Sequence, residues 1–228
     1  MAEGALRSAL NPGVRRRETF GWAMYDFANS GYTTVVLTAV FNAYFVSTVA
    51  GNAPWATFAW TATLSVSFAL VMFAGPIVGA WADAHAAKKA MLLVMTVICV
   101  IGTATLARAG PGTVGWAVAF IIVSNFAYAM GENLCAAFLP ELARPQALGK
   151  VSGWGWSLGY CGGIVALAVS LWWVMTAASR GSTTGEAVAG TMIITAVIYA
   201  LAAIPTFLFL KERALSHRAG SCRPRPSS

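Results

Sequence analysis

Charged residues are scarce in this sequence, and their scarcity excludes most soluble folds. Of 228 residues only 10% are charged and 58% are hydrophobic, whereas a soluble domain has roughly 25% charged residues. The net charge of +7 would by itself suggest nucleic-acid binding. The basic residues lie between long apolar runs, however, so we predict no nucleic-acid partner and a lipid bilayer as the surrounding medium.

The residues of metal and thiol chemistry are also few. Two histidines occur, His85 in a predicted loop and His217 in the tail. The four cysteines, Cys99, Cys135, Cys161 and Cys222, show no paired spacing. The first three cysteines fall in apolar runs, where a thiol behaves as a small hydrophobe. We therefore predict no disulfide, no metal site, no cofactor and, lacking any Ser/His or Cys/His constellation, no enzyme activity.

What is abundant is long apolar sequence. A bilayer core of about 30 Å needs roughly 20 apolar helical residues, because lipid cannot satisfy the backbone and only helices or closed barrels can cross it. Six such runs occur, at 20–49, 56–81, 89–108, 114–139, 151–175 and 187–210. We predict an all-α, polytopic membrane bundle of six helices.

The loop charges predict the orientation, because Lys and Arg are retained on the cytoplasmic side. Thirteen of the fifteen Lys and Arg fall before the first run, after the sixth, or in the loops on that same side; the exceptions are Arg108 and Arg180. We predict a cell-membrane protein with a cytoplasmic basic N-terminus at 1–19, a membrane domain at 20–210 and a basic, disordered cytoplasmic tail at 211–228.

A secretory signal is the alternative for the first run, because Arg15 to Arg17 precede it and small residues surround Ala50. The run is about twice the length of a usual signal core and contains Asp26 and Asn29. We therefore favour a membrane span.

Two carboxylates lie inside the predicted spans, where they are expensive and should face a protein interior or a water-filled cavity. Helical spacing extends each into a polar stripe, one on the first span and one on the fourth: Asp26, Asn29 and Thr33; Asn125, Tyr128 and Glu132. The functional interpretation is a site between these helices for a substrate or a coupled proton. The alternative is that both carboxylates are hydrated near the headgroups or pair with loop Lys and Arg.

The fifth span begins with a glycine-rich and aromatic stretch. Gly155 and Gly159 have the GxxxG spacing that permits close helix packing. Trp156 and Tyr160 share one face and are candidates for lining a cavity; alternatively, Trp154 and Trp156 are interfacial aromatics.

The loop between the second and third spans carries a candidate gating motif. Gly79 is followed by Asp83 at +4 and by Lys88 and Lys89 at +9 and +10. We expect Gly79 to permit tight packing, Asp83 to face a helix N-terminus and the lysines to anchor at the headgroups. The pattern resembles the cytoplasmic loop signature of the major facilitator superfamily, departing from it at Ala86 and Ala87.

Three further stretches narrow this resemblance. RETFGWAMYDFANS at 17–30, LPELA at 139–143 and VSGWGWSLGY at 151–160 are similar to the vacuole effluxer branch of that superfamily. The resemblance implies a secondary transporter working by alternating access, with helices one and four lining a cavity and helices three and six facing lipid. It also implies a small-molecule solute, with amino-acid efflux as an example, and a coupling ion such as H+.

Transporters of this superfamily have twelve spans in two halves, each a 3+3 inverted repeat, with the site between the halves. The six predicted spans correspond to the N-terminal half. We therefore expect the missing C-terminal half, or a second copy, as a partner. The alternative is a non-transporting membrane subunit that packs beside a separate protein.

Overall fold

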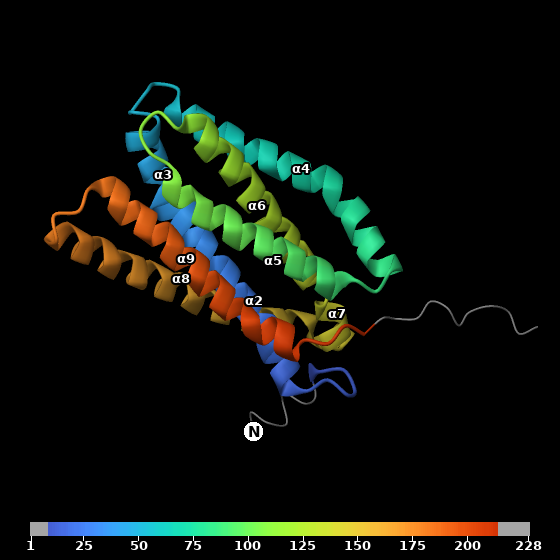
Figure 1. The fold of residues 1–228 in the computed structure, drawn as a ribbon. Coiled ribbons are helices and arrows are strands. Elements are labelled where there is room, and N and C mark those ends of the chain that lie inside the picture. Colours follow the sequence, from blue (N-terminus) through green and yellow to red (C-terminus); the bar gives the residue numbers. More distant parts are fainter. Residues whose placement is uncertain (1–8, 214–228) are drawn as a thin grey trace, which may run out of the picture.

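The computed structural model describes residues 9–213, so the N-terminal eight residues and most of the predicted tail, 214–228, lie outside the described residues. The elements are α2 (Arg16–Tyr32), η1 (Thr33–Ala39), α3 (Phe41–Tyr44), η2 (Phe45–Val49), α4 (Ala56–Ala84), α5 (Lys88–Thr105), η3 (Leu106–Arg108), α6 (Val114–Ala136), α7 (Leu139–Leu142), η4 (Pro145–Ala147), α8 (Leu148–Ser179) and α9 (Thr184–Phe209). Figure 1 shows them as one bundle of long helices.

Six stretches of the described chain are long and apolar enough to cross a membrane, which confirms the predicted all-α membrane fold. Their bounds are Arg16–Val49, Ala56–Ala84, Lys88–Arg108, Val114–Leu142, Pro145–Ser179 and Thr184–Phe209. Most extend a few residues past the apolar runs. Polar residues beyond the hydrocarbon core continue a helix readily, so hydropathy alone underestimates the helix ends.

The packing of the six spans follows a 3+3 repeat. In the first triplet α2 packs on α8 and α9, which are the second and third spans of the other triplet. In the second triplet α6 packs on α4 and α5 in the corresponding way. Because three spans are an odd number, the second triplet enters from the opposite side, and the repeat is inverted.

The first span departs from an α-helix after Tyr32. Residues Thr33–Ala39 and Phe45–Val49 form π-helical turns, closed by i→i−5 bonds such as Val40 N to Val35 O, 2.9 Å, and Ala50 N to Phe45 O, 2.8 Å. The stretch begins with four β-branched residues, which are stiff and weak helix formers. Sequence periodicity did not predict this change of helix type.

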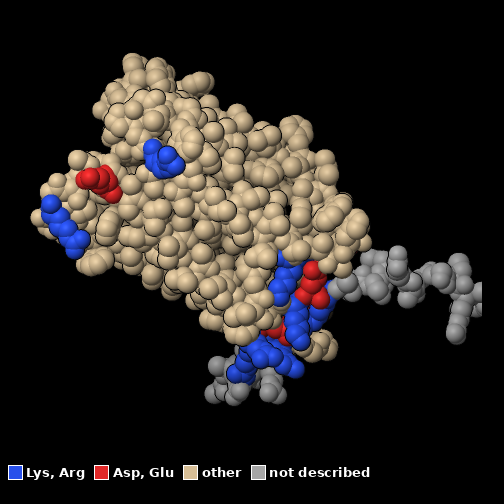
Figure 2. All heavy atoms as spheres, viewed as in Figure 1, with Lys and Arg blue, Asp and Glu red and all other residues tan. Residues whose placement is uncertain are grey.

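Both described ends of the chain lie at the same end of the bundle (Figure 1). The segment before α2 runs beside α7: Asn11 N donates to Leu142 O at 2.9 Å, and Arg144 N donates to Ala9 O at 3.0 Å. Figure 2 shows that Lys and Arg gather at this end. Arg108 and Arg180 lie at the opposite end, where η3 and α8 finish.

The glycines of α8 bring it directly against α2. A Cβ at Gly155 would lie 2.7 Å from the Trp22 ring, and one at Gly159 would lie 2.8 Å from Asp26 Oδ2. At Gly162 an added Cβ would collide with the backbone of Phe27. The prediction of close packing at the GxxxG glycines is confirmed.

Candidate functional site

A cavity of about 350 Å³ lies between α2, α6 and α8. Its lining combines two carboxylates, hydroxyls, three aromatic rings, and glycines and aliphatic residues of α8: Asp26, Ser30, Thr33, Thr34, Tyr128, Glu132, Trp156, Gly159, Tyr160, Gly163, Ile164 and Leu167. Six of the eight candidate substrate or coupling residues are therefore brought together. A smaller cavity of about 110 Å³ shares Asp26, Glu132 and Trp156 with it.

Asp26 and Glu132 face this common space from α2 and α6. Asp26 is half-buried, and its carboxylate makes no hydrogen bond or ion pair within residues 9–213. Glu132 is exposed to the cavity, and over the same residues it forms no ion pair with Lys or Arg. In the described chain the two carboxylates therefore do not pair with loop Lys or Arg. Their role in binding or coupling stays a prediction.

Asn29 lies in the smaller cavity and is held there by a buried chain of hydroxyls. Its Oδ1 accepts from Tyr199 OH at 2.6 Å, the Tyr199 and Tyr25 hydroxyl oxygens lie 3.3 Å apart, and Tyr25 OH is 3.2 Å from Thr96 Oγ1. The Tyr25 hydroxyl fits because residue 131 is glycine: an added Cβ would collide with it. The amide of Asn29 is thus fixed with its nitrogen free of this chain.

Thr33 and Tyr128 line the main cavity in different ways. Thr33 Oγ1 donates back to Asn29 O at 3.1 Å, in the turn where the π-helical stretch begins. Tyr128 stacks on Tyr32 with ring centroids 5.1 Å apart, and the Tyr32 hydroxyl lies 2.8 Å from Ser124 Oγ. These contacts fix the wall between α2 and α6.

Trp156 and Tyr160 form the aromatic side of the cavity. Their ring centroids lie 6.2 Å apart in an edge-to-face arrangement, and the residues are 63% and 66% exposed. Trp154, by contrast, has the Lys150 ammonium 5.7 Å from its ring centroid, as suits an interfacial aromatic. The two neighbouring tryptophans therefore have different surroundings.

Asn125 is the predicted site residue that lies elsewhere. It is fully buried, and its Nδ2 donates to Ser67 Oγ of α4 at 3.0 Å. A stripe at i, i+3 and i+7 covers a broad sector of a helix, and α6 is packed on both α4 and α5. Asn125 thus faces α4 while Tyr128 and Glu132 face the cavity.

Sequence reasoning missed several lining residues. Ser30 and Thr34 follow Asp26 at i+4 and i+8, so helical spacing alone could have found them. Tyr199 supports Asn29 from α9, and no short-range pattern in the sequence indicates it.

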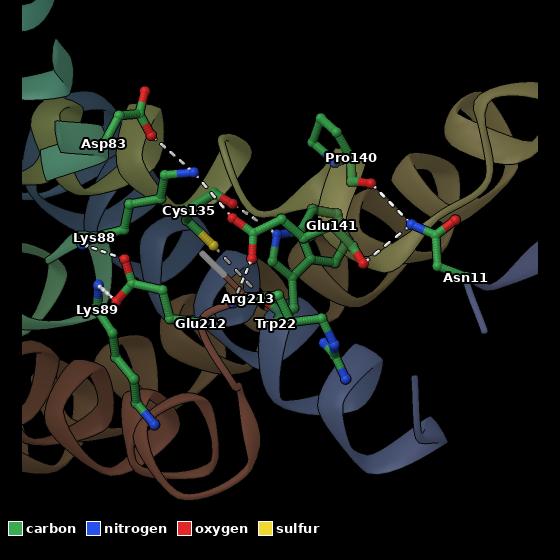
Figure 3. A network of polar contacts seen from close by, with 10 residues as sticks. All are labelled: Asn11, Trp22, Asp83, Lys88, Lys89, Cys135, Pro140, Glu141, Glu212 and Arg213. Carbon is green, nitrogen blue, oxygen red and sulfur yellow. Dashed lines mark hydrogen bonds and ion pairs between the residues drawn. The ribbon is translucent and has the colours of Figure 1, made fainter. Parts of the chain in front are cut away.

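A second polar cluster, which we call the terminal network, consists of Glu18, Asp83, Lys88, Lys89, Glu141, Glu212 and Arg213. Figure 3 draws most of it. Lys88 Nζ lies 2.9 Å from both Asp83 Oδ1 and Glu141 Oε1. The network joins α2, α4, α5 and α7 to the chain after α9.

Glu212 occupies the N-terminus of α5. Its Oε1 accepts from Lys88 N at 2.8 Å and its Oε2 from Lys89 N at 3.2 Å (Figure 3). A carboxylate is favourable there, since the first N–H groups of a helix lack partners within the helix. We expected Asp83 at a helix N-terminus, but Asp83 lies in the last turn of α4 with its side chain 64% exposed.

Glu141 and Arg213 complete the terminal network. Glu141 Oε2 accepts from Arg213 N at 2.8 Å, and Arg213 Nη2 pairs with Glu18 Oε2 at 2.6 Å. Lys89 Nζ donates to Leu210 O at 2.6 Å. Both lysines therefore have protein partners, whereas headgroup anchoring was expected.

Gly79 does not contact another element closely: an added Cβ would meet nothing within 4 Å. The expected tight packing at this glycine is therefore wrong for the described chain. Gly79 instead borders an open cleft of about 420 Å³ between α4 and α6, which Asp83 and Lys88 also line.

Comparisons with known proteins agree with this architecture. A family described as "Vacuole effluxer Atg22 like" matches residues 52–221. An uncharacterized MFS-type transporter, YxiO of Bacillus subtilis (strain 168), is 28% identical over 197 residues, which cover 84% of this chain and 46% of that protein. The chain thus spans less than half the length of this relative. No solved structure matches the chain significantly.

Proposed function

Because the chain belongs to the vacuole effluxer Atg22 like family, we propose that it forms one half of a secondary transporter that moves a small solute by alternating access. The observation that carries this proposal is the cavity between α2, α6 and α8, where Asp26 and Glu132 have no cationic partner in the described chain. Carboxylates inside a membrane span mark substrate or ion pathways.

A second half is part of the proposal. The relative YxiO is more than twice as long as its matched region, and α4 and α8 expose many large apolar side chains, among them Phe58, Phe73, Ile77, Ile164 and Met175. A missing C-terminal half, or a second copy, would cover such faces and close the open side of the cavity. Gly79, Asp83, Lys88 and Lys89 would then act at the gate.

The coupling ion in this proposal is H+, carried by Asp26 or Glu132, and amino acids are the first solutes to test. Purified chain is reconstituted into proteoliposomes, and uptake of a mixture of isotope-labelled amino acids is followed with and without a pH gradient. Uptake above that of empty liposomes, lost in Asp26→Asn and Glu132→Gln, is expected. Uptake that is unchanged in both variants would remove these residues from the mechanism.

A non-transporting subunit is the competing function, favoured by the same exposed faces of α4 and α8. It predicts a second protein that co-purifies in a fixed ratio and proteoliposomes that take up no solute. A transporter built from two copies instead purifies as a dimer of this chain.

The orientation proposed here places both ends in the cytoplasm, with the cell membrane as the location. The gathering of Lys and Arg at the end that carries both described termini supports it (Figure 2). Green fluorescent protein fused after residue 228 should fluoresce, while alkaline phosphatase at the same place should be inactive. Alkaline phosphatase inserted after Arg180, at the opposite end of the bundle, should be active; the reverse pattern would invert the topology.

A further inference from the structure

The sign of charge in the main and smaller cavities restricts what they can hold. Neither is lined by a Lys, Arg or His among the described residues, and both are lined by Asp26 and Glu132. Two carboxylates without a cationic partner favour a positively charged occupant, because an unpaired charge inside a membrane protein is costly.

A second observation indicates that the occupant is polar. Asn29 is only 4% exposed, and its Oδ1 is taken by Tyr199. Its Nδ2 has no hydrogen bond within the described chain, and Asn29 lines the smaller cavity. An amide N–H without a protein partner is available to a ligand or to a water that accompanies it.

The size of the cavity and its aromatic wall favour an organic cation over a bare metal ion. A volume of about 350 Å³ lies in the range of sites for small organic molecules. Trp156 and Tyr160 present exposed rings to the same space as Asp26. Aromatic faces attract organic ammonium groups, whereas hard metal cations prefer cages of oxygen ligands.

We propose that this cavity binds its solute through a protonated amine, which lies between the Asp26 carboxylate and the rings of Trp156 and Tyr160. The inference rests on the proposed function and narrows its substrate class. Among the described residues this half of the site contributes no Lys, Arg or His to pair with a solute carboxylate, so we expect the cation for such a group, where a solute has one, to come from the partner half.

The test compares three probes of nearly equal shape and different charge. Phenethylamine is cationic at neutral pH, 2-phenylethanol is neutral and 3-phenylpropionate is anionic. Binding of each to the purified full chain in lipid nanodiscs is measured by calorimetry, with empty nanodiscs as the blank. Phenethylamine should bind at least about tenfold more tightly than the alcohol, and the anion should bind weakest.

Three variants assign the binding to this cavity. Asp26→Asn should weaken phenethylamine binding about tenfold, and Trp156→Leu should weaken it about threefold. Glu186→Gln, which alters a carboxylate in the capping box of α9, should leave binding unchanged. Gel filtration and thermal midpoints establish that each variant is folded.

Either of two results overturns the proposal: the neutral or anionic probe binds as tightly as the amine, or Asp26→Asn leaves amine binding unchanged. Amine binding without uptake in proteoliposomes would remove the proposed transport and keep the amine site. Uptake of an uncharged solute that survives Asp26→Asn would keep the proposed transport and remove the amine site.

Discussion

The carboxylates of this chain fall into two groups with different surroundings. Glu141 and Glu212, in the terminal network, accept hydrogen bonds or pair with cations, and Glu141 has a side chain only 6% exposed. Asp26 and Glu132, in the cavity, form no ion pair in the described chain. The first group thus holds helices together, whereas in the proposed transporter the second group is available to a solute or a coupled proton.

Glu141→Ala should have the largest effect, since it breaks a buried pair and leaves Lys88 with the exposed Asp83 alone. We expect the free energy of unfolding to fall by about 3–5 kcal/mol. Denaturant unfolding in detergent micelles, followed by tryptophan fluorescence, measures this. Glu186→Gln, in the capping box of α9, serves as the control; an equal change in both variants would show that Glu141 stabilises the fold no more than an ordinary capping carboxylate does.

Glu212→Gln should cost less, about 1–2 kcal/mol, because the amide oxygen still accepts one N–H of α5 while the charge at the helix N-terminus is lost. The same unfolding measurement applies. Hydrogen exchange at the first turn of α5 should rise, and exchange that stays as in the parent chain would show that Glu212 is not needed there.

Asp26→Asn should change stability in the opposite direction. An unpaired, half-buried carboxylate in a span is unfavourable, so we expect the variant to be more stable by about 1 kcal/mol. Transport should be lost at the same time. A loss of stability in this variant would mean that Asp26 has a structural partner after all.

Glu132→Gln should have the smallest effect on stability, within about 0.5 kcal/mol, because the side chain is exposed to the cavity and forms no ion pair in the described chain. Its solute uptake should still differ from that of the parent chain. Unchanged unfolding together with unchanged uptake would assign Glu132 to neither group.

The sequence predicted the spans well because hydropathy is a local property that a bilayer enforces on every helix. It also predicted most of the cavity, since Asp26, Tyr128 and Trp156 lie on helical faces that spacing reveals. Asn125 was misjudged because a helix packed on two neighbours has more than one interior face.

The terminal network shows the limit of this reasoning. Glu212 contacts the first turn of α5 from 124 residues away along the chain. Nothing in the local sequence indicates that partner, because the contact depends on where α9 ends relative to α5. Likewise, Gly79 was expected to pack tightly, yet the space beside it is open.

The π-helical turns of the first span have a consequence for its length. Each i→i−5 closure accommodates one residue more than an α-turn would. The residues that follow are therefore rotated about the helix axis relative to α2. The polar cavity lining that the first span contributes begins at Asp26 and ends at Thr34. A chain lacking one residue within Thr33–Ala39 could close the same turns as ordinary α-helix. Single-residue deletions, which elsewhere in a membrane helix rotate everything that follows by about 100°, should therefore be tolerated best in this segment.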